Sequence, residues 1–459
     1  MKLAGWRGIL AVAFVVRVGV AFGWLRSMPL VSDAQDYAEE ARRLALGSAS
    51  APLGDAAFYW PPGNSLVLAT IYAAFGDSLW VTRGVMLFLS VVTVALIMLL
   101  SRELDARRDA RTERASGWLA ALYVPAVLLV GQSYAQHLAA MCLVGLAYFA
   151  LRAMREGRIG YFAVAGIAFG LGCLTRPSMA SAAPVLLVAW ALELRAKRIA
   201  RSKLALGAAL FVVVASALLV PVVRHNAAHG AGVTLSTNNE RNFFLGNNPY
   251  TPDYKTSHLG QRSLDELDPE TREYLTSFTT RESMQHEAVS YMAHHPAVTA
   301  YRTFNRATSF WGFDYLASRI IQEARGWGKR GLLPLLALEA GSYIATMVLA
   351  IAGVLAFGAP RAPAGDGDEP PADAVVDPFY RRWLVWLAFA YELPYMLAFS
   401  GGTYHFPALG LLLPFAGVAA ARWREWWPRV RSSRPTMIAV AAFFAIQVQY
   451  AYFSIAMSS

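Results

Sequence analysis

Long apolar segments separated by short basic loops set the strongest limit on how this chain can fold. Hydrophobic residues make up 56% of the 459 residues and charged residues only 16%, whereas a soluble domain averages about 25% charged residues. Many apolar segments approach or exceed the roughly 18 to 20 residues that an α-helix needs to cross a bilayer. The sequence therefore predicts an all-α polytopic membrane protein, surrounded by membrane lipids.

Eleven membrane-spanning helices are expected. The loops 102–114, 195–203 and 422–434 each contain five basic residues, whereas the short loops 132–135 and 400–403 contain none. Because basic loops stay in the cytoplasm, we expect a cytoplasmic N-terminus, an outer C-terminus and a location in the inner (plasma) membrane. The net charge of +10 is explained by these loops and does not indicate nucleic acid. The expected spans are 8–25, 80–101, 115–132, 136–152, 160–176, 179–194, 204–223, 332–357, 382–399, 404–421 and 436–456.

This topology divides the chain into three regions. Residues 1–223 form an N-terminal transmembrane module, whose first outer loop covers 26–79. Residues 224–331 are polar and long enough to fold into a small helical cap outside the membrane. Residues 332–459 form the C-terminal transmembrane helices and include a Pro- and Asp-rich cytoplasmic linker at 358–379.

Two short helices are expected in the first outer loop. Between residues 36 and 45, Tyr37, Ala41 and Leu44 share one face of an amphipathic helix. The apolar stretch 64–75 is too short to span the membrane and is typical of a re-entrant or interfacial helix.

Two carboxylates, Asp33 and Asp36, come directly after the first apolar segment. Carboxylates beside a membrane cost free energy unless they are hydrated or used. Asp33 could act as a general base on a hydroxyl. It could also cap a helix that begins near Ala34, a role for which Ser32 competes. Spacing alone favours the capping role.

Arg83 and Arg176 lie near the outer ends of their expected spans. Arginine binds phosphate through a bidentate fork, so both side chains suit a lipid-linked phosphate. The alternative is that they reach lipid headgroups. For Arg83 the two roles are equally compatible with the sequence. Arg176 is followed by Pro177 and lies near several glycines, which favours a functional role.

His405 lies at the outer start of a span and could donate to a phosphate or a sugar, or serve only as an interfacial anchor. The histidines show no recognised zinc spacing. The two cysteines, Cys142 and Cys173, lie in apolar segments and fit packing roles. We find no nucleotide-binding glycine motif. The sequence thus defines no cofactor and leaves a divalent metal open.

Several short motifs occur in an order that is typical of one superfamily. The chain resembles the GT-C polytopic glycosyltransferases, in particular the family 39-like group that includes protein O-mannosyltransferases and the lipid A aminoarabinose transferase. Three departures leave the substrate open: Ala34 follows Asp33, Gln136-His137 replaces an acidic helix start, and His405 replaces a common arginine. The matching residues are Asp33 to Tyr37, Pro61-Pro62-Gly63, Arg83, Gly170 to Pro177, Ser236-Thr237-Asn238, Leu245 to Pro249 and Tyr404 to Pro407.

The resemblance implies an inverting transfer of a sugar from a polyprenyl-phosphate donor to a hydroxyl of a protein, lipid or glycan on the outer side. Asp33 would be the base, with Asp36 and Tyr37 in the acceptor loop. Alternatives are a transporter or flippase for a lipid-linked glycan and a non-catalytic membrane scaffold. The donor phosphate would be held by Arg176, Arg83 and His405, and further substrate contacts would come from Asn247, Asn248 and Tyr404.

Overall fold

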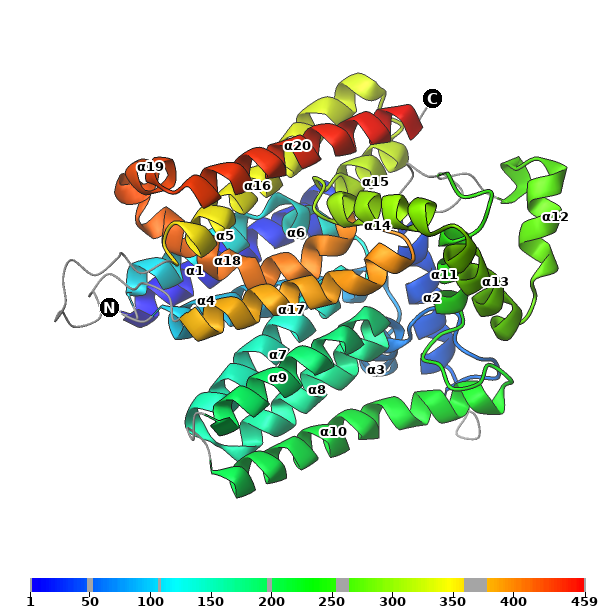
Figure 1. The fold of residues 1–459 in the computed structure, drawn as a ribbon, viewed down its shortest axis with the longest axis horizontal. Coiled ribbons are helices and arrows are strands. Elements are labelled where there is room, and N and C mark those ends of the chain that lie inside the picture. Colours follow the sequence, from blue (N-terminus) through cyan, green and yellow to red (C-terminus); the bar gives the residue numbers. More distant parts are fainter. Residues whose placement is uncertain are drawn as a thin grey trace.

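The computed structural model describes residues 2–47, 53–105, 109–195, 200–252, 264–358 and 378–457, and their regular structure is helical. Long helices run side by side in one bundle (Figure 1). The prediction of an all-α membrane protein is confirmed. The helices of the bundle are α1 (Lys2–Val18), α4 (Leu79–Leu104), α5 (Ala110–Leu122), α6 (Val124–Leu128), α7 (Gln136–Glu156), α8 (Ile159–Thr175), α9 (Ala182–Arg195), α10 (Arg201–Ala228), α16 (Lys329–Leu355), α17 (Pro378–Leu397), α18 (Phe406–Ala421) and α20 (Arg434–Met457).

Each of the eleven expected spans corresponds to helical structure, but the count of eleven is not confirmed. Within the described residues, eight helices are long and apolar enough to cross a membrane, or nine if the bent pair α5 and α6 is one span. Of the expected spans, α8 has only 17 residues. The helix α17, which includes Arg381, Arg382 and Glu392, is also not among the eight.

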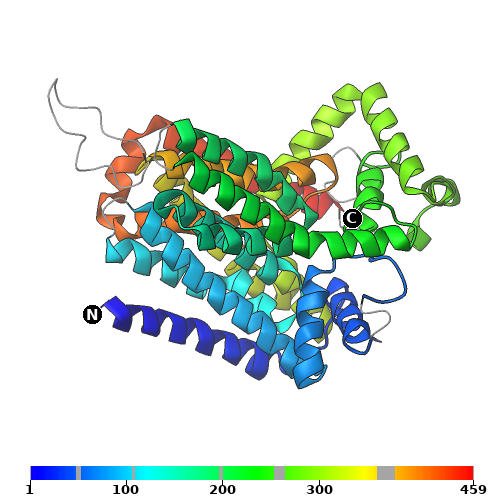
Figure 2. The same cartoon turned by 90° about the horizontal axis from the view of Figure 1, so that it is seen from below.

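The shorter helices gather at one end of the bundle, away from the start of α1 and from α19 (Trp423–Ser432) (Figures 1 and 2). We call this the outer end, because the sequence predicts that it faces away from the cytoplasm. Both segments that are expected outside the membrane, 26–79 and 224–331, contribute to it. Its helices include α2 (Asp33–Ala45), α3 (Gly63–Phe75), α11 (Asn238–Gly246), α12 (Pro269–Ser277) and α13 (Arg281–His294).

The two helices expected in the first outer loop are present. In α2, Tyr37 and Ala41 are buried and Leu44 is half-buried, so the amphipathic pattern is confirmed. The helix α3 covers the apolar stretch 64–75. The Ser65 hydroxyl donates to the Tyr37 carbonyl at 3.0 Å, which links the two helices.

Segment 224–331 is mostly helical, as expected for the cap. The long helix α10 extends as far as Ala228 before the cap begins. After α13 the chain forms α14 (Pro296–Phe310) and α15 (Leu316–Arg325) and then enters α16. Most of the expected cytoplasmic linker, 359–377, lies outside the described residues.

Close packing in the bundle depends on small residues. A Cβ atom on Gly166 would lie 2.7 Å from the Phe211 carbonyl oxygen, and one on Gly170 would lie 3.1 Å from that of Ala215. Small residues four apart let two helices approach closely inside a membrane. This spacing brings α8 against α10 and fixes the position of the outer end of α8.

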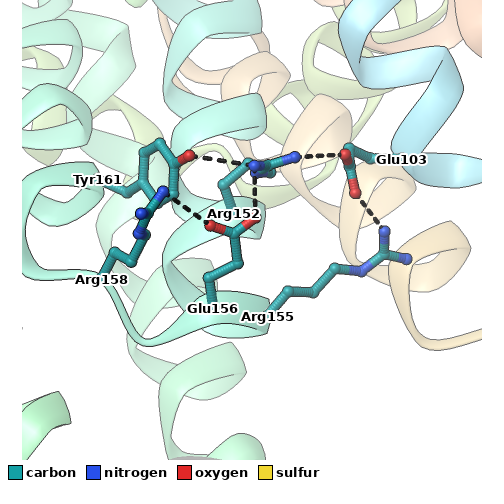
Figure 3. Close-up of polar contacts among 6 residues, drawn as sticks. All are labelled: Glu103, Arg152, Arg155, Glu156, Arg158 and Tyr161. Atoms are coloured by element: carbon teal, nitrogen blue, oxygen red, sulfur yellow. Dashed lines mark hydrogen bonds and ion pairs between the residues drawn. The ribbon is translucent and has the colours of Figure 1, made fainter.

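The last turns of α4 and α7, at the end of the bundle away from α2 and α3, carry a cluster of paired charges. Figure 3 shows its side chains. Glu103 of α4 accepts from Arg152 at 2.8 Å and from Arg155 at 2.5 Å, both on α7. Arg152 also donates to the Tyr161 hydroxyl of α8 at 3.1 Å. Arg155 stacks over the Tyr380 ring, 4.3 Å from its centroid. The cluster therefore joins four helices, α4, α7, α8 and α17.

Candidate active site

A cavity of about 560 Å³ lies at the outer end. It is formed where the start of α2, the end of α8, one face of α11 and the end of α17 meet. Of the described residues that line it, Asp33 and Arg176 are the only charged ones. The polar and aromatic lining consists of Ser32, Tyr37, Trp60, Tyr134, Gln136, Thr175, Ser178, Asn238, Asn239, Asn242, Tyr395, Thr403 and Tyr404.

Asp33 is the first residue of α2 and does not cap it. Ser32 holds the cap position, but no side chain there makes a capping hydrogen bond. The capping role that spacing favoured for Asp33 is therefore wrong. Ser32 has a φ of 53°, the only positive φ of a non-glycine residue in the described part of the chain. Such backbone strain costs roughly 1 to 3 kcal/mol and gathers at functional sites.

The environment of Asp33 raises the pKa of its carboxyl. Burial is the main cause; the Ser32 hydroxyl, which donates to Asp33 at 3.3 Å, and the charge of Arg176 lower the pKa in part. Asp33 forms no ion pair among the described residues. A partly buried carboxylate with a raised pKa beside a cavity has the properties that general bases need.

Arg176 directly follows α8 and points its unused donors into the same region. One of its terminal nitrogens donates weakly to the Tyr395 hydroxyl at 3.4 Å, and its guanidinium lies 5.4 Å from the centre of the Tyr404 ring. Its Nε is buried and has no hydrogen-bond partner, and it makes no ion pair within the described residues. A half-buried guanidinium with a free donor is suited to an anionic ligand such as phosphate.

The Pro61-Pro62-Gly63 turn packs against the end of α8. A Cβ atom on Gly63 would lie 2.6 Å from both the backbone nitrogen and the hydroxyl oxygen of Thr175. Only glycine fits at this contact, because any side chain would push α3 away from α8. The turn thereby brings Trp60 and Pro61 to the cavity beside Arg176.

Of the other expected site residues, Tyr37 and Tyr404 line the cavity. Asp36 is exposed on α2 and is not part of the lining. It lies about one turn further along the helix than Asp33, so only one of the two carboxylates reaches the cavity.

Arg83 lies outside the cavity lining, and its donors are used elsewhere. It donates to the carbonyls of Gly131 at 3.2 Å, Arg26 at 3.0 Å and Met28 at 2.5 Å. These contacts tie the segment before Asp33 to the segment before Gln136. Arg83 therefore holds the two segments together, and its role toward the donor phosphate stays a prediction.

His405, Asn247 and Asn248 are buried and are not part of the lining. The His405 ring pairs with the Phe310 carbonyl at 2.9 Å and stacks on Tyr343 at 4.2 Å. The Asn247 amide donates to the Leu397 carbonyl at 2.7 Å. Asn247 thus holds the end of α11 to the end of α17, whereas the Asn248 amide donates back to the Phe244 carbonyl of α11 at 3.0 Å. The structure does not bring these three residues to Asp33 and Arg176.

Several lining residues were not expected as site residues from the sequence. Asn238, Asn239 and Asn242 come from one face of α11, and Gln136 comes from the start of α7. The sequence gives part of this signal, because Asn238 belongs to the Ser236-Thr237-Asn238 motif and Gln136 departs from the family pattern, but neither feature indicates a role in the site. Within the described residues no group of three or more His, Cys, Asp or Glu side chains could hold a metal ion.

Comparison with known proteins identifies the fold. Residues 60–220 match the sequence model of the dolichyl-phosphate-mannose-protein mannosyltransferase family. The crystal structure of the Archaeoglobus fulgidus oligosaccharyltransferase with Zn and sulfate superposes with a TM-score of 0.50 and 14% identity, over 97% of this chain and 53% of that one. This likeness shows that the chain has the GT-C fold, and the family match covers part of its length.

Two further solved structures resemble the chain to different degrees. The apo form of the A. fulgidus enzyme has a TM-score of 0.50 at 15% identity, over 98% of this chain and 56% of its own. The chain thus spans about half the length of that enzyme. ArnT from Cupriavidus metallidurans, bound to undecaprenyl phosphate, gives a TM-score of 0.39 at 18% identity, over 92% of this chain and 77% of that one. A search of the curated proteins found no match.

Proposed function

We propose that this protein transfers a sugar from a polyprenyl-phosphate donor to an acceptor hydroxyl on the outer side of the membrane. The main support for the proposal is that one cavity contains both a candidate general base and a candidate phosphate-binding group. One carboxylate, Asp33, and one guanidinium, Arg176, line it, and neither forms an ion pair among the described residues. The name of the matching family, which acts with dolichyl-phosphate-mannose, supports a lipid-linked donor.

In the proposed reaction, Asp33 accepts the proton of the acceptor hydroxyl. The acceptor oxygen then bonds to the anomeric carbon as the bond from that carbon to the phosphate oxygen breaks. The polyprenyl phosphate leaves, and its new negative charge is stabilised by the free donors of Arg176. Because the nucleophile and the leaving group lie on opposite faces of the sugar, the anomeric configuration is inverted.

The proposal also gives a role to the aromatic rings near the two charges. Tyr395 and Tyr404 lie beside Arg176, and Trp60 lies near Tyr37 with ring centroids 5.9 Å apart. Aromatic walls keep water away from the reacting atoms, which strengthens electrostatic stabilisation. Water that reached the anomeric carbon would hydrolyse the donor.

The test is donor consumption by the purified full chain in lipid nanodiscs. Mannosyl, glucosyl and aminoarabinosyl polyprenyl phosphates are supplied with a mixture of peptide, lipid and glycan acceptors, and released polyprenyl phosphate is measured by mass spectrometry. We expect release from at least one donor by the wild type and none above background by Asp33→Asn.

Intact donor in every wild-type reaction would overturn the proposal. The same chain in sealed vesicles then separates the alternatives. Movement of intact donor between the leaflets would identify a flippase, and no movement would identify a non-catalytic protein.

A further inference from the structure

A second cavity, of about 510 Å³, lies on the other face of α11. Asn238, Asn239 and Asn242 of this helix face the active-site cavity, whereas Glu240 and Arg241 line the second one. Its remaining walls come from the segment after α10 and from the start of α13. The volume is typical of sites for small ligands.

The two cavities share a second wall, the segment Phe58-Tyr59-Trp60. The Thr237 amide donates to the Phe58 carbonyl at 2.9 Å, and the Asn238 amide donates to the Tyr59 carbonyl at 3.2 Å. The Phe58 amide in turn donates to the buried Asn226 side chain at 2.9 Å. These bonds hold the segment against α11, so the two cavities keep a fixed spacing.

Three aromatic rings form a row from one cavity to the other. Tyr37 and Trp60 line the active-site cavity, and Tyr59 lines the second one. The Trp60 ring lies 5.9 Å from the Tyr37 ring and 5.1 Å from the Tyr59 ring. The Tyr59 side chain is 44% exposed although it is large and apolar over most of its surface. An exposed ring in a fixed position offers a stacking surface to a ligand.

Glu240 supplies an unused acceptor beside this ring. Its carboxylate is 9% exposed, and Oε1 accepts from Arg281 Nε at 2.8 Å. The second oxygen, Oε2, is buried and has no hydrogen-bond partner among the described residues. A buried carboxylate oxygen without a donor costs free energy. A ligand hydroxyl in the cavity would supply that donor.

We infer that the second cavity is the subsite that holds a neutral carbohydrate acceptor, next to the sugar unit that enters the active site. This inference rests on the proposed function. A sugar offers hydroxyl donors to Glu240 and to the threonines of the lining, Thr237 and Thr279, and an apolar face to Tyr59. The row of rings leads from this subsite to the hydroxyl acceptor position beside Asp33.

The lining favours a glycan over the other acceptor classes. Besides Tyr59, its larger apolar side chain is Met284, which is too little surface to hold an acyl chain. Extended peptides gain affinity from strand edges and helical peptides from apolar grooves. The described part of this cavity has helix starts, turns and hydroxyl side chains instead.

The experiment measures binding by the full chain in nanodiscs without donor. Mannotriose, maltotriose and xylotriose, and a serine- and threonine-rich peptide, are titrated and followed by saturation-transfer NMR. We expect at least one trisaccharide to bind, and Tyr59→Ala and Glu240→Gln each to weaken it about tenfold, the equivalent of one aromatic or charge-assisted contact. Tyr301→Ala is the matched control, because Tyr301 is 48% exposed on α14 and outside both cavities.

Absence of binding by all three trisaccharides, or equal affinities in wild type and Tyr59→Ala, would overturn the inference. Peptide binding that is lost in Tyr59→Ala would also overturn it, in favour of a protein acceptor. A different result would overturn the proposed function and leave this inference standing. Trisaccharide binding that depends on Tyr59, in a chain that consumes no lipid-linked sugar, would leave a carbohydrate-binding site without transferase activity.

Discussion

The two ends of the helix bundle use charge in opposite ways. In the Glu103 cluster of Figure 3 each arginine has a carboxylate within ion-pair distance, and Glu103 itself has two arginine partners. At the outer end, Asp33 and Arg176 line one cavity and neither is in an ion pair within the described residues. Side chains in ion pairs hold helices together, whereas charged side chains without an ion-pair partner in a cavity can bind a ligand.

Backbone geometry differs in the same direction. The carboxylate and the two arginines at the centre of the Glu103 cluster come from the regular helices α4 and α7. The residue before Asp33, Ser32, is held at a positive φ. Proteins commonly accept lower stability at functional sites. The comparison predicts that substitutions at the outer end cost activity and substitutions at the other end cost stability.

The largest effect is expected from Asp33→Asn. Loss of a general base should lower the transfer rate by about 10² to 10⁴, while the folded protein remains able to bind the donor. Transfer is measured as sugar appearing on the acceptor. Asp36→Asn is the matched control, since Asp36 is exposed, and should change the rate by no more than about twofold. Equal losses in both variants would remove Asp33 from the role of base.

Glu103→Gln should act on stability. The change leaves Arg152 and Arg155 without their shared carboxylate, which should lower the free energy of unfolding by about 2 to 4 kcal/mol. Thermal unfolding in detergent measures the loss. Glu425→Gln removes an exposed pair with Arg429 and should cost no more than about 0.5 kcal/mol. A Glu103→Gln protein that is as stable as wild type would break the comparison.

Arg83→Leu tests whether an arginine near the cavity can be purely structural. The variant loses three hydrogen bonds to backbone carbonyls, so we expect a loss of roughly 2 to 3 kcal/mol in stability. Affinity for polyprenyl phosphate should stay at the wild-type value when it is measured below the melting temperature. A selective loss of affinity would return Arg83 to the phosphate site.

The smallest effect concerns the stability of Asp33→Asn at different pH values. Burial raises the pKa of Asp33 in the folded protein above the unfolded value of about 3.9. Protonated Asp33 therefore contributes fully to the stability of the folded protein below about pH 3.9. This contribution is lost as the pH rises through the pKa of Asp33 in the folded protein. Asp33→Asn should melt at a higher temperature than wild type at pH 8, and the difference should shrink toward pH 4. A constant difference would contradict the burial of an unpaired charge.

Helical class and segment positions could be predicted from sequence because they depend on local apolar length and composition. The α2 amphipathic pattern and the Pro61-Pro62-Gly63 turn were likewise visible. The partners of Arg83 were not, because backbone carbonyls of residues 26 and 131 leave no mark in side-chain patterns. The asparagine face of α11 was also hidden, since it becomes a cavity wall only when the segment Phe58-Tyr59-Trp60 docks against it.

The central claim is that Arg176 holds the phosphate of a lipid-linked donor. The most direct measurement is the affinity of folded, detergent-solubilised wild type, Arg176→Lys and Arg176→Ala for polyprenyl phosphate. Loss of charge-assisted hydrogen bonds worth about 1 to 3 kcal/mol predicts a roughly 10- to 100-fold weaker affinity in Arg176→Ala. Arg176→Lys should fall between, because lysine keeps the charge but loses the fork. Equal affinities in wild type and Arg176→Ala would contradict the claim.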